Sequence, residues 1–292
     1  MLALHVRSTG ATASAPDESE SIYQEDWGPI RKWRRRLVAP LFRIADSGLF
    51  GLTPLRTHIM ICGFPRSGTT LLQMMLENAL PQARRFGREV GGWRAATYSW
   101  RNHPIVISKV PHDVFRLAGL RNFYANRSAS LRIILMLRDP RDVLTSRRTV
   151  GGPPGYVVGP ERWRKYYRAF IQERSNQDVL VIGYEDLVRD VARHQRQVEE
   201  FTGEPVQIPL EEFHKVERPD FDTSTLNGLR AVEQSCVARW GAPEHRQRID
   251  AMLCEIPELP EALITLGYEN DDRWISAWRN QQEASSVLQV TG

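Results

Sequence analysis

The sequence of 292 residues has few cysteines and no long hydrophobic run. Its three cysteines, Cys62, Cys236 and Cys254, are an odd number at wide spacing, which argues against a disulfide framework and against a zinc site. The longest obvious apolar run, residues 133–137, is far shorter than the roughly 18 residues of a membrane span, and residues 1–16 lack the apolar core of a signal peptide. We therefore expect a cytoplasmic protein without a transmembrane segment.

A strong excess of one charge is also missing. Lys and Arg number 39 against 35 acidic residues, which gives a formal net charge of +4. Nucleic-acid binding usually needs a clustered basic stripe, so this mild excess favours an anionic small ligand and no nucleic acid. Hydrophobic residues at 41% and charged residues at 25% are close to globular averages, which excludes a collagenous or wholly disordered chain.

The first 57 residues differ from the rest of the chain. Residues 1–21 are rich in small and polar side chains, so we expect a disordered tail. Residues 22–57 form a basic extension that contains Trp27 and Trp33 among several arginines. Such a segment could touch an anionic membrane or a partner, but more often it is a solvated helix face whose tryptophans pack on the domain. Residues 58–292 are expected to form one catalytic domain.

Four short apolar runs, each followed by a helix-like segment, organise this domain. The runs are residues 58–62, 104–110, 131–137 and 178–184. None of them alternates apolar with polar residues, which is typical of strands that are buried on both faces. The sequence therefore predicts an α/β fold with a mainly parallel central sheet flanked by helices. The segment after the fourth run, residues 185–203, is expected to be a single helix that ends at Gly203.

The sharpest motif lies between the first run and the first helix, in residues 63–70, GFPRSGTT. A turn of this kind directs backbone N–H groups and the positive end of a helix toward one point, as phosphate binding requires. Its two glycines have the spacing of a nucleotide P-loop, but Thr69 stands where that motif needs Lys, and the cation is Arg66 inside the loop. Asp139, just after the third run, keeps a magnesium-dependent kinase as an alternative.

A second motif spans residues 138–146, RDPRDVLTS. Arg138 ends the third strand and offers a charge-assisted fork, while Ser146 lies two helical turns further on and points the same way. The loop resembles the 5′-phosphosulfate loop of sulfotransferases, which use 3′-phosphoadenosine 5′-phosphosulfate (PAPS). The form PRSGTT looks most like that of tyrosylprotein and many bacterial members. The second motif is similar to the 3′-phosphate site of the same family.

This resemblance implies a sulfotransferase that needs no metal and transfers a sulfuryl group from PAPS to an acceptor hydroxyl. The acceptor stays open between a glycan, a lipid or natural-product alcohol and a protein tyrosine, and the oligomeric state is equally open. A non-catalytic nucleotide-binding protein is the alternative from a different class. The residues implied to bind the donor are Arg66, Ser67, Gly68, Thr69, Thr70, Arg138, Ser146, Tyr184, Ser235 and Arg239.

Three of these donor residues lie outside the two motifs. Tyr184 belongs to a YEDL segment similar to one that the family places near the adenine; alternatively, Tyr184 only ends a strand and Asp186 caps the next helix. Ser235 and Arg239 belong to a segment that resembles the closing part of bacterial and tyrosylprotein members. The Gly-rich RKG segment of cytosolic members is absent, which leaves the adenine and 3′-phosphate contacts open.

Catalysis needs a cation at the leaving oxygen and a base for the acceptor hydroxyl. Lys109 aligns with a family Lys that contacts the bridging oxygen or the sulfonate, and Arg66 would share this role. Glu89 follows Arg66 by 23 residues, close to the separation at which tyrosylprotein and heparan-type sulfotransferases place a catalytic Glu. His112 is the alternative base, one residue later than the His of cytosolic sulfotransferases.

Overall fold

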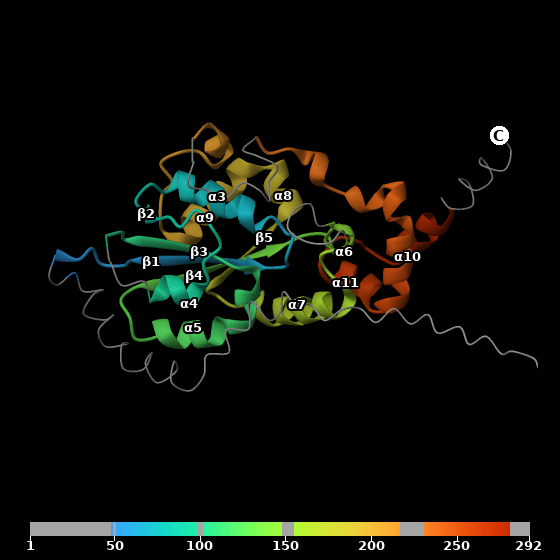
Figure 1. Cartoon of the computed structure of the whole chain (residues 1–292), viewed down its shortest axis with the longest axis horizontal. Helices are drawn as coiled ribbons and strands as arrows, with labels where there is room; N and C mark the ends of the chain where they lie inside the picture. The colour runs from blue at the N-terminus through green and yellow to red at the C-terminus, as the bar shows by residue number, and fades with distance from the viewer. Residues whose placement is uncertain (1–47, 49–50, 98–101, 148–154, 217–230, 281–292) are drawn as a thin grey trace, which may run out of the picture. The chain divides into compact units, whose positions relative to one another are not determined.

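The computed structural model describes residue 48 and residues 51–97, 102–147, 155–216 and 231–280 (Figure 1). The expected tail of residues 1–21 lies outside the described residues, and so does most of the basic extension, including Trp27 and Trp33.

The described residues contain a five-stranded sheet in which every strand pair is parallel. The order across the sheet is β2-β3-β1-β4-β5. The four predicted strands are confirmed, with bounds that differ by at most one residue at either end; the two-residue β2 was not predicted because it is too short to carry a pattern. The strands are β1 Thr57–Gly63, β2 Ala83–Arg84, β3 Ile105–Lys109, β4 Ser130–Leu137 and β5 Val179–Gly183.

Helices cover both faces of this sheet (Figure 1). Successive residues of β1 point to opposite faces: Ile59 and Ile61 pack with α3 and α9, whereas Met60 and Cys62 pack with α4, α5 and α7. Burial on both faces explains why the strands read as unbroken apolar runs. The helices are α3 Thr69–Ala79, α4 Gly92–Ala96, α5 Leu117–Tyr124, α6 Pro140–Thr145, α7 Pro160–Glu173, α8 Tyr184–Arg189, α9 Val191–Thr202, α10 Arg246–Glu255 and α11 Leu259–Thr265.

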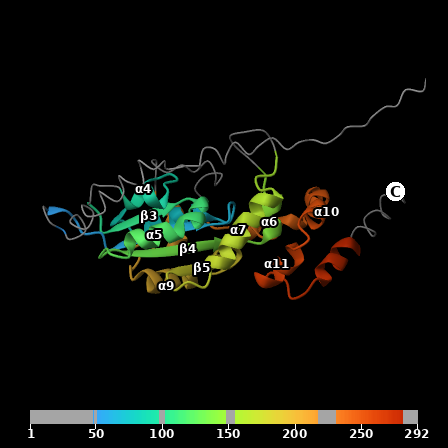
Figure 2. The same cartoon turned by 90° about the horizontal axis from the view of Figure 1, so that it is seen from below.

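Short 3₁₀ helices connect several of these elements. They are η2 Pro111–Arg116, η3 Leu210–Lys215, η5 Gln234–Cys236, η6 Arg239–Gly241 and η7 Pro243–His245. Figures 1 and 2 both show α10 and α11 beside α6, which directly follows the end of β4. The C-terminal part of the chain therefore gathers at the carboxyl ends of the strands, where ligands bind in open α/β sheets.

The single helix expected after β5 is wrong, because the chain forms two helices, α8 and α9, that meet at Asp190. Its backbone torsions, φ −142° and ψ 78°, are not helical, and its side chain accepts from the Arg193 N–H at 2.9 Å. An aspartate that satisfies a free N–H in this way starts a new helix instead of continuing the old one. Gly203 ends α9 in the left-handed conformation at φ 72°, which confirms the predicted closure.

The described residues can be searched for membrane-spanning helices, disulfide bonds and clusters of metal ligands. No helix in the described ranges has the length and the apolar character needed to cross a membrane. All three cysteines are free thiols, and Cys62 is buried in the sheet. Within the same ranges, His, Cys, Asp and Glu side chains do not gather in groups of three that could hold a metal ion.

Candidate functional site

The loop between β1 and α3 depends on two glycines. Gly63 has φ 122°, and a Cβ atom there would lie 2.3 Å from the carbonyl oxygen of Met136 on the neighbouring strand. Gly68 has φ 85°, and a Cβ atom there would lie 2.5 Å from Cδ2 of Tyr184. Both positions combine a left-handed backbone with a close approach, so each requires glycine. The glycine spacing seen in the sequence therefore has a steric cause.

The first turn of α3 offers its backbone N–H groups to a ligand. No side chain caps this end of the helix, and no acidic residue stands in its first turn. The buried Ser67 hydroxyl instead donates to the Phe64 carbonyl at 2.6 Å, which closes the loop below the helix end. An uncapped helix N-terminus of this kind favours an anion.

Arg66 connects this loop with the second motif. Its backbone is left-handed at φ 66°, an unusual conformation for a residue with a Cβ atom. Its Nε donates to the Ser146 hydroxyl at 2.8 Å, and its carbonyl accepts from Arg138 Nη1 at 3.1 Å. Three residues that the sequence assigned to two motifs thus lie at one site.

This cluster carries an excess of positive charge. Burial, and then the charge of Arg138, lowers the pKa of Arg66. The Nε atom of Arg138 is buried and has no hydrogen-bond acceptor in the described structure. A buried donor without an acceptor costs free energy, and two neighbouring guanidinium groups repel each other. An anion bound between them would relieve both costs.

The Tyr184 ring packs against the Arg138 side chain of this cluster. The Arg138 guanidinium lies over its ring, 4.5 Å from the ring centre, and burial raises the pKa of Tyr184 to about 12. Tyr184 begins α8, whose N-cap is Gly183. The alternative in which Asp186 caps this helix is wrong, because no side chain bonds at that cap and Asp186 pairs with Arg189 at 2.9 Å.

Lys109 lies at the end of β3 and contacts both the loop helix and the candidate base. Its Nζ donates to the Thr70 hydroxyl at 2.9 Å and forms an ion pair with Glu89. The Lys109 side chain is buried at 1% exposure, whereas that of Glu89 is 44% exposed. The Lys109 backbone also donates to the Val90 carbonyl at 3.1 Å, which holds the Glu89 segment against the strand. A buried cation therefore lies behind a carboxylate that solvent can reach.

His112 lies in η2, among aromatic rings. Its ring centre is 4.9 Å from that of Phe115 and 6.5 Å from that of Tyr166. Burial raises the pKa of Tyr166 to about 12, and the negative charge of Glu89 adds to this rise. Tyr166 therefore interacts with both candidate bases, His112 by ring packing and Glu89 by charge.

Ser235 and Arg239 are exposed and interact within their own segment. The Ser235 hydroxyl donates to Glu233 at 3.1 Å, and Arg239 Nε donates to the Ser235 carbonyl at 2.8 Å. The segment reaches the cluster through its backbone instead, because the Cys236 carbonyl accepts from Arg138 Nη2 at 2.5 Å. The sequence could not reveal this contact, since every residue type has a carbonyl group.

Asp139, the residue that keeps the kinase alternative open, is committed to an ion pair. Its carboxylate accepts from Arg141 Nη2 and from the Arg141 backbone N–H, both at 2.8 Å. Its own backbone N–H donates to Glu185 at 2.9 Å, and Glu185 accepts from the Tyr268 hydroxyl at 2.9 Å. These bonds join the second motif to the YEDL segment and to the C-terminal part of the chain.

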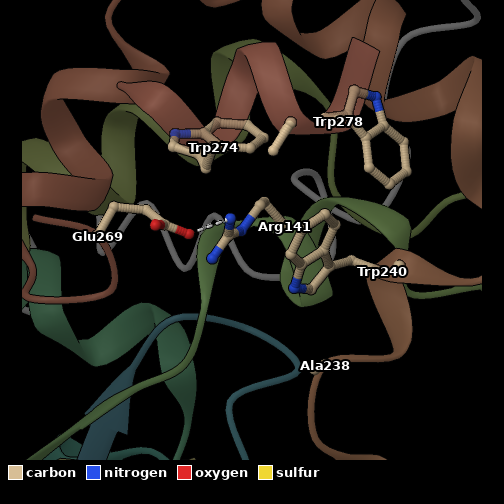
Figure 3. Close-up of a pocket in the computed structure, with 8 residues that line it drawn as sticks. Arg141, Ala238, Trp240, Glu269, Trp274 and Trp278 are labelled. Carbon is tan, nitrogen blue, oxygen red and sulfur yellow. Dashed lines mark hydrogen bonds and ion pairs between the residues drawn. The ribbon is translucent and has the colours of Figure 1, made fainter. Parts of the chain in front are cut away.

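Arg141 makes the second connection to the C-terminal part (Figure 3). Its Nη1 donates to Glu269 at 2.5 Å, and its guanidinium lies 4.0 Å from the Trp240 ring centre and 4.8 Å from that of Trp274. These side chains, together with Trp278, line a pocket of about 380 Å³. Arg141 is thus paired with two carboxylates and lies over two aromatic rings, and these contacts join α6 to the C-terminal part of the chain.

Comparison with known proteins finds similarity to sulfotransferases. Residues 56–152 match a family model described as the sulfotransferase domain, and this stretch contains both motifs. Human Sulfotransferase 2A1 is 21% identical over 183 residues, which are 52% of this chain and 62% of that protein. The match thus spans less than two thirds of the relative. The two findings support a sulfotransferase family assignment and confirm the resemblance inferred from the motifs.

Three solved structures are similar to parts of this chain at low sequence identity. The sulfotransferase domain of the Synechococcus PCC 7002 olefin synthase has a TM-score of 0.48 at 17% identity, over 68% of this chain and 94% of that chain. The sulfotransferase domain of the curacin biosynthetic pathway has a TM-score of 0.44 at 15% identity, over 68% and 98%. Retinol dehydratase in complex with androsterone and the inactive cofactor PAP has a TM-score of 0.39 at 10% identity, over 75% and 84%.

Proposed function

We propose that this chain transfers a sulfuryl group from PAPS to the hydroxyl group of an acceptor. The observation that carries the proposal is the hydrogen bond from Arg66 Nε to Ser146 Oγ, which joins the two phosphate-binding motifs. The match to the sulfotransferase domain over residues 56–152 supports it. PAPS would supply a sulfuryl group already activated on a phosphate leaving group.

The residues of the cluster fit a nucleotide with two phosphate sites. The N–H groups of the α3 first turn and the Arg66 guanidinium would bind the 5′-phosphosulfate. Arg138 and Ser146 would bind the 3′-phosphate, with the free Arg138 Nε as one donor. The Tyr184 ring would lie near the adenine. The other residues proposed to bind the donor are Ser67, Gly68, Thr69, Thr70, Ser235 and Arg239.

Glu89 is proposed as the base and Lys109 as the electrophilic partner. Glu89 is 44% exposed and so accessible to an acceptor, and it would take the proton of the acceptor hydroxyl as the new oxygen–sulfur bond forms. Protonation of Glu89 removes the charge that holds Lys109, which frees the ammonium to neutralise the leaving phosphate oxygen as the old sulfur–oxygen bond breaks. Arg66 would share that charge, and no metal is required. His112 is the alternative base.

Two other functions make different demands on the same site. A magnesium-dependent kinase would need a free acidic residue near the loop, but Asp139 is paired with Arg141 and Thr69 replaces the P-loop Lys. A non-catalytic nucleotide-binding protein would keep the cluster but would not need the pair of Glu89 and Lys109. Sulfuryl transfer accounts for more of these residues than either alternative does.

The acceptor would be a glycan, a lipid or natural-product alcohol, or a protein tyrosine, and we expect the reaction in the cytoplasm. The test is transfer of labelled sulfate from PAPS to a panel of glycans, phenols, lipid alcohols and peptides, read by mass spectrometry. A labelled ester on any of them supports the proposal. Tight nucleotide binding without transfer to any of them would favour the non-catalytic function, and magnesium-dependent ATP turnover at the loop would favour the kinase.

A further inference from the structure

Asp142 is a buried carboxylate at the junction of the site and the C-terminal segment. It lies in α6, four residues after Arg138, and 1% of its side chain is exposed. Its Oδ2 accepts from Arg138 Nη2 at 3.3 Å and from the Ala238 N–H at 3.1 Å, and its Oδ1 accepts from the Trp240 N–H at 2.9 Å. One carboxylate thus binds an arginine of the site and two backbone groups of the segment.

The same segment returns to Arg138 from the other side. The Cys236 carbonyl accepts from Arg138 Nη2 at 2.5 Å. Between these contacts, Ala238 takes a left-handed backbone at φ 56°, which is unfavourable for a residue with a Cβ atom. The hydrogen bonds that Asp142 accepts from the Ala238 and Trp240 N–H groups lie at this turn and offset its cost. Figure 3 shows the result, with Trp240 held beside Arg141 of the same helix α6.

We propose that Asp142 is a positioning residue of the donor site. It fixes the Arg138 guanidinium in the orientation that binds a 3′-phosphate, and it folds residues 234–241 over that guanidinium. The inference rests on the proposed function, because a nucleotide 3′-phosphate is the group that Arg138 would bind. Asp142 itself does not touch the nucleotide.

Charge and orientation make opposite predictions for this residue. A carboxylate near an anion site repels a phosphate, so charge alone predicts tighter nucleotide binding when Asp142 becomes neutral. In Asp142→Asn, an NH₂ group replaces one oxygen, and the amide cannot accept from Arg138, Ala238 and Trp240 together. The amide either opposes Arg138 with its NH₂ group or keeps only an uncharged acceptor there, so Arg138 is held less firmly in either orientation and binding becomes weaker. The sign of the change therefore separates the two effects.

The test is isothermal titration calorimetry of the full chain with 3′-phosphoadenosine 5′-phosphate (PAP) and with AMP, which lacks the 3′-phosphate. Asp142→Asn is expected to weaken PAP about tenfold to a hundredfold, the usual worth of a hydrogen bond to a charged group, and to leave AMP nearly unchanged. The matched control is Asp186→Asn. Asp186 is 62% exposed and pairs with Arg189, so this variant changes the net charge equally without touching Arg138.

Each outcome decides a different question. Unchanged or tighter PAP binding by Asp142→Asn, with a wild-type chain that prefers PAP to AMP, overturns the positioning role alone. A wild-type chain that binds PAP no better than AMP overturns the proposed function and the inference with it. Equal weakening of PAP and AMP by a folded Asp142→Asn chain would show a general effect on the site and would also contradict the positioning role.

A second measurement uses only the wild-type chain and does not depend on whether Asp142→Asn folds. Hydrogen exchange of the wild-type chain is expected to show that PAP slows the Ala238 and Trp240 amides more than AMP does, because only PAP fixes Arg138 against the segment. Equal slowing by the two nucleotides would overturn the proposal even if Asp142→Asn does not fold.

Discussion

Arg66 donates from Nε to the Ser146 hydroxyl at 2.8 Å, across a sequence separation of 80 residues. Arg66 belongs to the loop after β1, and Ser146 follows the helix after β4. Because β1 and β4 are adjacent parallel strands, the segments that follow them emerge at the same edge of the sheet. The bond therefore brings the two motifs together at one site.

Arg138→Ala should weaken the nucleotide that carries a 3′-phosphate and spare the one that lacks it. The loss removes a charge-assisted hydrogen bond, so we expect PAP to bind about tenfold to a hundredfold more weakly, with AMP little changed. Calorimetric titration with both ligands measures this. Arg189→Ala, a change on the exposed surface of α8, is the control. Unaltered discrimination between PAP and AMP would contradict the 3′-phosphate role of Arg138.

Glu89→Gln should lower turnover about 10² to 10⁴-fold, the usual worth of a general base, while PAP binding stays close to wild type. The amide keeps the shape of the side chain but cannot take a proton. Glu212→Gln is the matched control, because Glu212 is also paired with a lysine, at 2.9 Å, but lies in η3. Turnover in the Glu89 variant equal to that of this control would remove Glu89 from the mechanism.

His112→Ala should change turnover by less than about tenfold, because we propose Glu89 as the base, and His112 packs against the rings of Phe115 and Tyr166. Steady-state rates at saturating PAPS provide the comparison with Glu89→Gln. A larger loss of turnover in His112→Ala than in Glu89→Gln would indicate that His112, and not Glu89, is the base.

Gly68→Ala should destabilise the chain by at least about 1 kcal/mol and abolish PAP binding. The new Cβ would need a left-handed backbone and would lie 2.5 Å from the Tyr184 ring. Gly159→Ala provides the control: Gly159 has φ −90°, and a Cβ there meets nothing within 4 Å. Urea unfolding should show the control within about 0.5 kcal/mol of wild type. Similar stabilities of the two variants would contradict the steric account of the loop.

Tyr166→Phe should remove part of the alkaline loss of stability. Burial raises the pKa of Tyr166 in the folded chain from 10.0 to about 12. Between these values the unfolded chain releases the proton and the folded chain does not, so stability falls as pH rises, by up to about 1.4 kcal/mol per pH unit. Urea unfolding at pH 9, 10 and 11 should show a shallower decline for the variant. If the free energy of unfolding falls equally with pH in the wild-type chain and in the variant, the burial of the Tyr166 hydroxyl would be contradicted.

The sheet and the first loop could be predicted because their physical causes leave marks in the sequence. Strands buried on both faces appear as unbroken apolar runs, and the close approaches at Gly63 and Gly68 admit only glycine. The break at Asp190 could not be predicted, because aspartate occurs both within a helix and at its start. Only the position of the Arg193 N–H in the folded chain decides between them.

The contacts between the C-terminal segment and the site could not be predicted from the sequence, for a related reason. Ser235 and Arg239 stood out as polar side chains, yet the segment reaches Arg138 through the Cys236 carbonyl and Asp142 through two amides. Backbone groups are the same in every residue, so they leave no pattern in the sequence. Asp142 itself resembles any acidic residue in the first turn of a helix, and only its three bonds reveal what it joins.

Arg66 and Ser146 are proposed to hold PAPS for transfer of its sulfuryl group to a hydroxyl group. The decisive experiment is to incubate the full chain with labelled PAPS and the acceptor panel and to measure the labelled sulfate ester that forms. We expect an ester on at least one acceptor class with the wild-type chain, and a rate about 10² to 10⁴-fold lower with Glu89→Gln. Tight PAP binding without ester formation on any acceptor, or equal rates for the two proteins, would contradict the account.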